Sequence, residues 1–230
     1  MVLRLVAMLA LVGALLTGHT TAATTPESAL RLRAFERLLD AAAAGDEPAM
    51  WATLSRVSRR RLGPTLVDFR SRGARGVRDG LAPFARASYR VILNALVDRM
   101  LGLVAVARRN DAVAIPVRRE GGAWKLEIDP LFTVEAVRPL PGERVLRRTQ
   151  LFAEVSAPGK IDGAAMWFDG VFFDARGYWS PNKQRMSIWG EAPQPLRNGR
   201  HTVIAFASTG SEAAANAWVF TARGRGSGSR

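Results

Sequence analysis

The densest group of charged side chains in this sequence is basic. Arg56, Arg59, Arg60 and Arg61 lie close together, and four more arginines follow at Arg70, Arg72, Arg75 and Arg78. On a helix, Arg56, Arg59 and Arg60 share one face, which would attract anionic cell-wall polymers, lipid headgroups or nucleic acid. Surfaces that bind nucleic acid usually interleave aromatic side chains with the charges, and apart from Phe69 this stretch has none. The cluster therefore predicts contact with an anionic surface, with a solvated helix face as the alternative.

Proton-transfer catalysis would need a buried carboxylate base and a tyrosine or protonated acid as oxyanion donor. The candidates in this sequence are Asp68, Asp98 and Tyr89. Asp98 stands beside Arg99 in a predicted turn, and Asp68 lies in an irregular segment, so both positions favour a solvated role. We assign no catalytic residue and expect a non-catalytic protein, with an isomerase or lyase-type enzyme as the alternative.

Metal and triad chemistry have few residues to draw on. The chain has no cysteine and two histidines, which excludes zinc sites of the usual Cys/His kind. His201 follows a predicted turn at the start of a strand, which favours a structural hydrogen bond. Calcium binding by Asp162, Asp169 and Asp174 is the alternative use of the acids, but two of the three precede a glycine, as turn residues do. We expect no metal and no cofactor.

Aromatic side chains supply two further sets of candidates. A pocket in the first half of the chain would be lined by Trp51, Phe69, Phe84, Tyr89 and Trp124, or the same side chains would fill the core. Tyr178 and Trp179 lie in a predicted loop, where they would recognise a sugar or a partner, or else cap a core.

The first half of the chain has the pattern of helices followed by strands. Apolar residues at helical spacing predict a helical hairpin from Ser28 to Leu62, joined at Gly45-Asp46. Glycines and prolines make residues 63–87 a loop with one short helix around Val77–Phe84. The predicted strands then follow at Tyr89–Leu93, Leu101–Ala107, Ala112–Val117 and Trp124–Ile128. Residues 84–101 also fit a helical period, so a helix there stays as the alternative. We expect an α+β domain over residues 24–138.

The second half of the chain has the sequence pattern of an all-β domain. Proline and glycine at 139–142 and the basic residues to Arg148 predict a linker over 139–148. Short strand patterns separated by turn signals then predict a β-sandwich over 149–223, with a helix considered only at Glu212–Asn216 and a flexible tail at 224–230. The predicted strands are Leu151–Val155, Ala164–Phe168, Val171–Phe173, Met186–Trp189, His201–Ala207 and Ala217–Thr221.

The first domain resembles the NTF2-like superfamily over about residues 28–137. The resemblance rests on the helix pair joined by Ala44-Gly45-Asp46, on Trp51 and Leu54 after it, and on the closing strands 114–117 and 122–127. It implies helices packed into the concave face of a curved antiparallel sheet. Such folds enclose a conical pocket that serves catalysis in some families and binding in others, so the fold leaves the function open.

The second domain resembles a bacterial immunoglobulin-like module over about residues 149–223. The segments that carry the resemblance are Met166–Gly170, Pro195–Val203 and Ala217–Phe220. It implies an adhesion or interaction module.

The N-terminus predicts export. Arg4 is followed by an apolar run from Leu5 to Leu16 and then by small residues up to Ala23, the order found in a secretory signal peptide. We expect cleavage after residues 1–23 and a secreted or envelope-associated protein, with an uncleaved N-terminal anchor as the alternative. No later segment has the length and apolarity of a membrane span.

These observations predict an exported, non-catalytic binding protein of two domains. With a net charge of +13, its expected partners are an anionic cell-surface polymer or a protein, with a small-molecule ligand as a further class and nucleic acid not expected. A cell-surface structural or assembly protein is the remaining alternative.

Overall fold

The computed structural model describes residues 26–85, 88–146, 148–193 and 195–223. The predicted signal peptide and the predicted tail lie outside these residues. Within them, no helix has the length and apolar character needed to cross a membrane.

The described chain begins with helices, as expected, but they are shorter and more numerous than a hairpin. They are α2 (Pro26–Ala44), α3 (Glu47–Thr53), α4 (Arg56–Leu62), α5 (Leu66–Arg72) and α6 (Ala74–Leu81). The predicted break is confirmed: Gly45 has φ +69° and Asp46 accepts a hydrogen bond from the Ala49 amide. The expectation of one short helix in 63–87 is wrong, because Thr65 and Asp68 form a capping box that starts α5.

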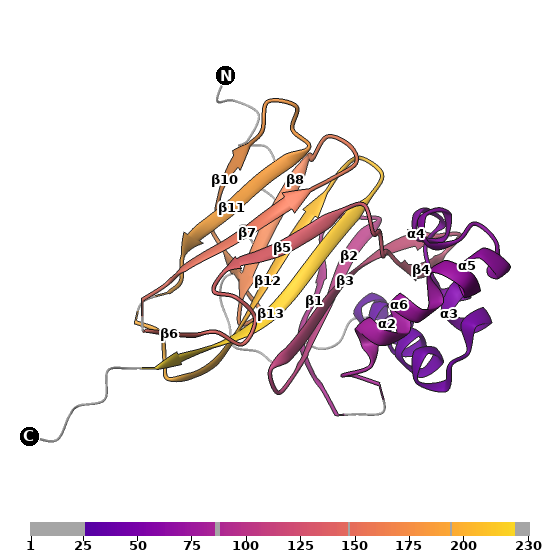
Figure 1. Cartoon of the computed structure of the whole chain (residues 1–230), viewed down its shortest axis with the longest axis horizontal. Coiled ribbons are helices and arrows are strands. Elements are labelled where there is room, and N and C mark those ends of the chain that lie inside the picture. Colours follow the sequence, from indigo (N-terminus) through magenta and orange to yellow (C-terminus); the bar gives the residue numbers. More distant parts are fainter. Residues whose placement is uncertain (1–25, 86–87, 147, 194, 224–230) are drawn as a thin grey trace, which may run out of the picture.

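A four-stranded antiparallel sheet, here called sheet A, follows the helices. Its strands run in chain order as β1 (Arg90–Leu96), β2 (Leu101–Arg108), β3 (Asp111–Glu120) and β4 (Ala123–Leu126). The strand alternative for residues 84–101 is therefore the correct one over 90–96. The helices cover one face of this sheet (Figure 1) and bury a shared apolar core that includes Phe35, Leu38, Phe69, Val104 and Leu126.

The rest of the chain forms two further sheets. Sheet B has the order β10-β11-β7-β5, and sheet C has the order β6-β13-β12-β8-β9. This division is that of the immunoglobulin sandwich, in which the first, second, fourth and fifth main strands form one sheet and the third, sixth and seventh form the other. The strands are β5 (Thr133–Arg138), β6 (Arg144–Leu146), β7 (Gln150–Ser156), β8 (Gly163–Phe168), β9 (Val171–Phe173), β10 (Arg176–Trp179), β11 (Arg185–Glu191), β12 (Gly199–Ser208) and β13 (Ala213–Arg223).

Several predicted boundaries need correction. β5 falls in the range predicted for the first domain, yet it pairs with β7 in sheet B. The predicted linker contains β6, which pairs in parallel with β13. Tyr178 and Trp179 belong to β10 and not to a loop. The helix considered at Glu212–Asn216 is absent, because β13 begins at Ala213 and pairs with β12.

Sheet C is covered on both faces. One face packs on sheet B through a core that includes Phe168, Val203, Trp218 and Phe220. The other packs on sheet A through a second apolar cluster, in which Trp167, Ile204 and Phe206 meet residues of β2 and β3 such as Leu103 and Ala114. The molecule is thus a stack of helices, sheet A, sheet C and sheet B.

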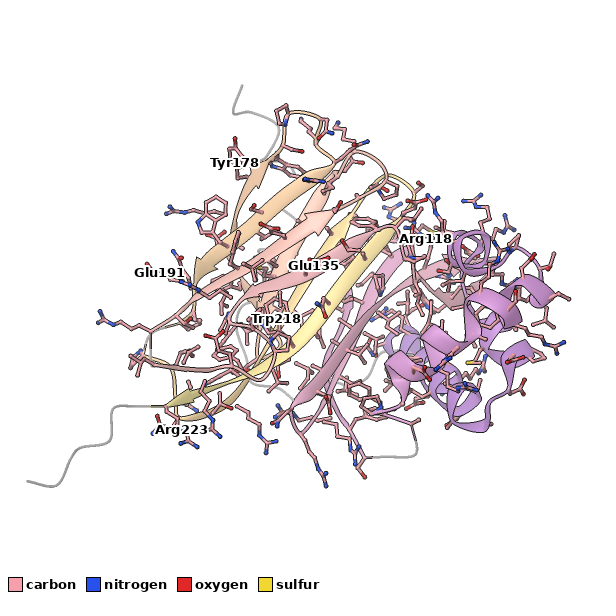
Figure 2. All side chains as sticks on the ribbon, in the orientation of Figure 1. Arg118, Glu135, Tyr178, Glu191, Trp218 and Arg223 are labelled. Atoms are coloured by element: carbon pink, nitrogen blue, oxygen red, sulfur yellow. The ribbon has the colours of Figure 1, made fainter. Side chains whose placement is uncertain are left out.

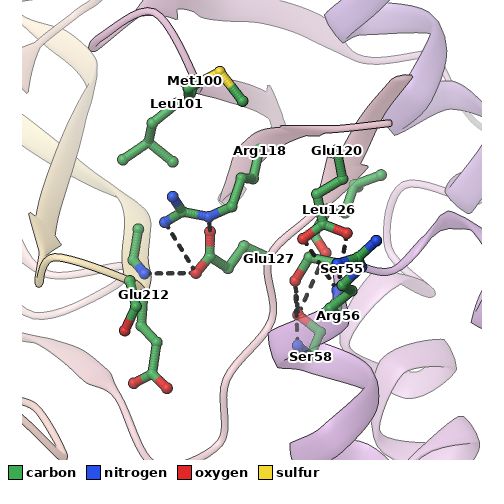
Figure 3. A network of polar contacts seen from close by, with 12 residues as sticks. Ser55, Arg56, Ser58, Met100, Leu101, Arg118, Glu120, Leu126, Glu127 and Glu212 are labelled. Carbon is green, nitrogen blue, oxygen red and sulfur yellow. Dashed lines mark hydrogen bonds and ion pairs between the residues drawn. The ribbon is translucent and has the colours of Figure 1, made fainter. Parts of the chain in front are cut away.

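We call the helices with sheet A the first unit, and sheets B and C the sandwich. A buried ion pair of the first unit accepts a hydrogen bond from the sandwich (Figure 3). Arg118 Nε lies 2.8 Å from Glu127 Oε2, and the Ala213 amide at the start of β13 donates to Glu127 Oε1 over 2.8 Å. Burial raises the pKa of the Glu127 carboxyl, although Arg118 and the Ala213 amide act in the opposite direction. Nearby, Arg61 contacts the buried Asp129 and also Glu212, at 3.6 and 3.3 Å. Charged groups therefore hold the two units together at one end of the apolar interface.

Candidate functional site: an arginine cleft between the units

Three arginines distant in sequence meet at the other edge of this junction. A hollow of about 390 Å³ is lined by residues of β6, β12 and β13 and by Asn110 in the turn between β2 and β3. Its lining residues are Asn110, Gly142, Arg144, Gly199, Arg200, Val219, Thr221 and Arg223. The volume lies in the range of roughly 300–1,000 Å³ that is usual for ligand sites. We call this hollow the arginine cleft.

Strand pairing places its cationic side chains. Thr221 lies opposite Arg144 on one side and opposite Arg200 on the other, so the three residues form a row across β6, β13 and β12. Arg223 follows two residues after Thr221 on the same face of β13. The pairing of β6 with β13 therefore creates the cleft, because it carries Arg144 onto the edge of the sheet.

The electrostatics of the arginine cleft have one sign. No acidic residue lines it, and in the described part of the chain none of Arg144, Arg200 and Arg223 forms an ion pair. All three are exposed and remain charged at any physiological pH. Asn110 and Thr221 add neutral hydrogen-bonding groups. Such a site suits a carboxylate, sulfate or phosphate, which guanidinium groups bind through paired hydrogen bonds.

The predicted arginine cluster is partly used within the fold. Arg59 lies 4.1 Å over the Trp51 ring and donates to the Trp51 and Ala52 carbonyls at the end of α3. Arg61 pairs with Asp129 and Glu212 as described above. Arg56 and Arg60 are exposed on α4. These last two are the members available for an anionic surface.

The predicted pocket aromatics lie in different environments. Phe69 and Phe84 are buried in the core between the helices and sheet A. Tyr89 packs edge-on against Phe35, and the Trp51 indole donates to the Gly63 carbonyl. Trp124 is largely buried, donates to Glu27 and borders a separate hollow between α2, α3 and β4.

That second hollow, of about 560 Å³, has alanine walls and charges of both signs. Lys125 donates to the same Ala52 carbonyl as Arg59, and burial, followed by the charge of Arg59, lowers the pKa of the Lys125 ammonium. Asp40 and Asp46 also line the hollow. Trp124, Lys125 and Asp46 already form hydrogen bonds within the fold, which leaves few groups of this hollow free for a ligand, so we regard the arginine cleft as the better candidate.

The carboxylates considered for catalysis serve local structure. Asp68 belongs to the capping box of α5, and Asp98 accepts from the Met100 and Leu101 amides in the β1–β2 turn. No hydrogen bond in the described residues joins either one to Tyr89. Burial, with a smaller contribution from Glu36 and Asp40, raises the pKa of the Tyr89 phenol.

His201 has the structural role expected for it. Its ring nitrogens contact Asp169 Oδ2 at 2.7 Å and the Arg197 carbonyl at 2.8 Å, and the ring lies against Phe168 and Phe220. Asp169 also accepts from the Thr202 amide. Among the described residues, no group of three or more His, Asp or Glu side chains is arranged to hold a metal ion.

Sequence patterns did not reveal the arginine cleft. Arg144 lies in the predicted linker, Arg200 directly before the predicted strand His201–Ala207, and Arg223 two residues after the predicted strand Ala217–Thr221. Arg144 and Arg200 each follow a turn that contains a glycine, Gly142 or Gly199. This shared position does not reveal which strands lie side by side, so it could not predict the cleft.

Comparison with known proteins adds little beyond the fold. No protein-family model and no curated protein matches this sequence. Among solved structures, the titin M4 domain aligns with 40% of this chain and 93% of its own length, at 10% identity and a TM-score of 0.30. The titin tandem A164-A165 aligns with 55% of this chain and 63% of its own, at 6% identity and a TM-score of 0.27.

An endo-β-1,4-mannanase from Thermotoga petrophila aligns with 41% of this chain at 8% identity and a TM-score of 0.33. This chain covers only 20% of that structure. At such scores the alignments indicate nothing about function. The immunoglobulin-like sandwich of this protein is defined by its own strand order.

Proposed function

We propose that this protein is an exported, non-catalytic binding protein that holds an anionic partner in the arginine cleft. The observation that carries the proposal is the convergence of Arg144, Arg200 and Arg223 around a hollow with no acidic lining. The partner class is a polymer bearing carboxylate, sulfate or phosphate groups, such as an anionic cell-surface polymer.

The architecture supports a binding role. An immunoglobulin-like sandwich is a frequent scaffold for interaction modules, although the fold alone does not define a function. Helices packed on one face of an antiparallel sheet are also compatible with the NTF2-like assignment of the first unit, which we keep as part of the proposal. Export rests on the N-terminal residues 1–23.

Dextran sulfate binding, measured by titration calorimetry over a series of salt concentrations, tests the proposal. The cleft variant replaces Arg144, Arg200 and Arg223 by Gln. A matched control replaces Arg33, Arg37 and Arg99 by Gln, since these are exposed and, within the described residues, form no ion pair. Both variants have the same net charge, so a general effect of charge is equal in the two.

We expect the cleft variant to bind more weakly and with a smaller salt dependence. With fewer contacts to sulfate groups, fewer counterions are released from dextran sulfate on binding. The control should show only the general effect of three lost charges, and should therefore bind more tightly and with a larger salt dependence than the cleft variant. Equal affinities and equal salt slopes for the two variants would contradict the proposal. A third variant with Gln at Arg56 and Arg60 shows how much α4 contributes.

A further inference from the structure

The outer face of sheet B carries a groove that none of the preceding sections assigns. It has a volume of about 360 Å³ and receives side chains from all four strands of the sheet. Its lining residues are Thr133, Glu135, Glu154, Val155, Ser156, Tyr178, Ser180, Arg185, Met186 and Ser187. Figure 2 labels Glu135 on β5 and Tyr178 on β10, the two edge strands of this sheet.

Strand register builds the groove as two rows. Ser187 lies opposite Tyr178 on one side and opposite Glu154 on the other, and Glu154 lies opposite Glu135. The small Ser187 side chain therefore forms a floor, with the Tyr178 ring as one wall and the two carboxylates as the other. In the neighbouring row, Arg185, Ser156 and Thr133 lie opposite one another.

The charged groups of this groove have no partners within the described part of the fold. Glu135 and Glu154 face each other as like charges, an arrangement that destabilises a sheet. Within the described residues, neither of them forms an ion pair or a side-chain hydrogen bond, and the Arg185 guanidinium pairs with no carboxylate. Tyr178 is 68% exposed. Ser180 forms hydrogen bonds to Asn182 and to the Arg185 backbone, but the two carboxylates, the Arg185 guanidinium and the Tyr178 ring remain open to a ligand.

The balance of charge argues against an ionic ligand. The two carboxylates would repel an anion. A cation would meet Arg185 in the groove and also Arg138 and Arg176, which lie in the next row of the same face beside Phe152 and Trp189. A neutral ligand avoids both penalties.

We propose that this groove binds a neutral oligosaccharide. Hydroxyl groups of a sugar both donate and accept, so one ligand can donate to Glu135 and Glu154 and accept from Arg185. The apolar C–H face of a pyranose ring can stack on Tyr178, whose amphipathic ring suits a half-wet contact. Phe152 and Trp189, both half-buried, continue the aromatic surface along the sheet. This site is separate from the arginine cleft and takes an uncharged ligand.

Titration calorimetry with short neutral oligosaccharides of glucose, mannose, xylose and N-acetylglucosamine tests this assignment. The variants are Tyr178→Ala, Tyr178→Phe and the double change Glu135→Gln with Glu154→Gln. Phe172→Ala and Glu191→Gln are the matched controls, because both residues are exposed and lie outside the groove. All these positions are at the surface, so the variants should fold, and far-ultraviolet circular dichroism checks this.

We expect at least one of these sugars to bind, with an affinity that does not change with salt. Tyr178→Ala should weaken binding about tenfold or more, Tyr178→Phe should weaken it much less, and the controls should bind normally. Absence of binding to every sugar, or equal binding by Tyr178→Ala and Phe172→Ala, would overturn the assignment. Salt-dependent binding of spermine that is lost in the double glutamine variant would instead identify a cation site and overturn it as well.

Discussion

Sheets B and C belong to one sandwich but have opposite surroundings. Along β7 of sheet B, burial alternates, with Leu151, Ala153 and Val155 inside and Glu154 and Ser156 outside. Along β12 of sheet C, every residue from His201 to Ala207 is buried. The difference shows that both faces of sheet C are buried in apolar cores, whereas only one face of sheet B is buried. Sheet C is an internal layer between two cores, whereas sheet B has a solvated face on which a ligand can bind.

The largest expected effect comes from separating the units. A fragment of residues 149–230, which begins after the predicted linker, lacks β5 and β6 and exposes the apolar face of sheet C that packs on sheet A. We expect this fragment to remain unfolded or to aggregate, as judged by circular dichroism and size-exclusion chromatography. A soluble fragment with a cooperative thermal transition would mean that sheet C does not need its second covering layer.

A single substitution at the interface of sheets A and C should be nearly as damaging. Phe206 is 2% exposed in the cluster between these sheets, and its change to Ala should lower the free energy of unfolding by about 3–5 kcal/mol. Phe172→Ala serves as the control, because Phe172 is 55% exposed and should cost far less. Chemical denaturation measures both. Similar losses in the two variants would contradict an internal role for sheet C.

The substitution Glu127→Gln affects the polar end of the interface between sheets A and C. In acid we expect a loss of only about 1 kcal/mol, because the Gln side-chain oxygen can still accept hydrogen bonds from Arg118 and from the Ala213 amide. Burial raises the pKa of Glu127 in the folded protein. At a pH just above the usual glutamate pKa, the folded protein therefore still holds the proton on Glu127, whereas the unfolded chain has released it. The advantage of the parent protein over the variant should therefore be largest in acid and fall as pH rises through the folded pKa.

Denaturation at several pH values measures this difference. A stability gap that widens with rising pH would show that attraction to Arg118 outweighs the cost of burying Glu127.

The smallest effect is expected on the open face of sheet B. Glu154→Gln removes one of two like charges that lie opposite each other, so the free energy of unfolding should rise by roughly 0.2–1 kcal/mol. Glu191→Gln, also exposed on sheet B, is the control and should change little. A marked loss of stability in Glu154→Gln would indicate that the face is not free in the folded protein.

Local patterns predicted most of the secondary structure. The runs of β-branched residues identified all four strands of sheet A, and turn pairs such as Asp169-Gly170, which have positive φ at both residues, identified the β8–β9 hairpin. β10 lacked a clear alternation, since Gly177 interrupts it. The prediction assigned β5 to the first domain, because Thr133–Arg138 directly follows sheet A in the chain. The residue pattern of a strand does not show which strand it pairs with.

The sequence of β12 contains a signal for the interface between the two units, but the alternation of residues along the strand draws attention to only one of its faces. Val203, Ala205 and Ala207 alternate along β12 as one apolar face, but Ile204 and Phe206 between them, and Trp167 on β8, are also apolar and larger than the two alanines. A strand that is apolar at every position is buried on both faces. The arginine cleft had no such signal, because it depends on the parallel pairing of the short β6 with β13. The aromatic Tyr178 was identified as a candidate for sugar recognition, but the facing carboxylates depend on register.

Native-state hydrogen exchange followed by NMR tests the central claim most directly, namely that sheet C is shared by the two units and leaves only sheet B with an open face. Amides of Val104–Val106 in sheet A and Ile204–Phe206 in sheet C are all buried. We predict that both sets exchange only through global unfolding, with the same opening free energy and the same dependence on denaturant. If the sheet A amides exchange through a separate opening, with a lower free energy and a smaller denaturant dependence, the two units fold independently and the claim is wrong.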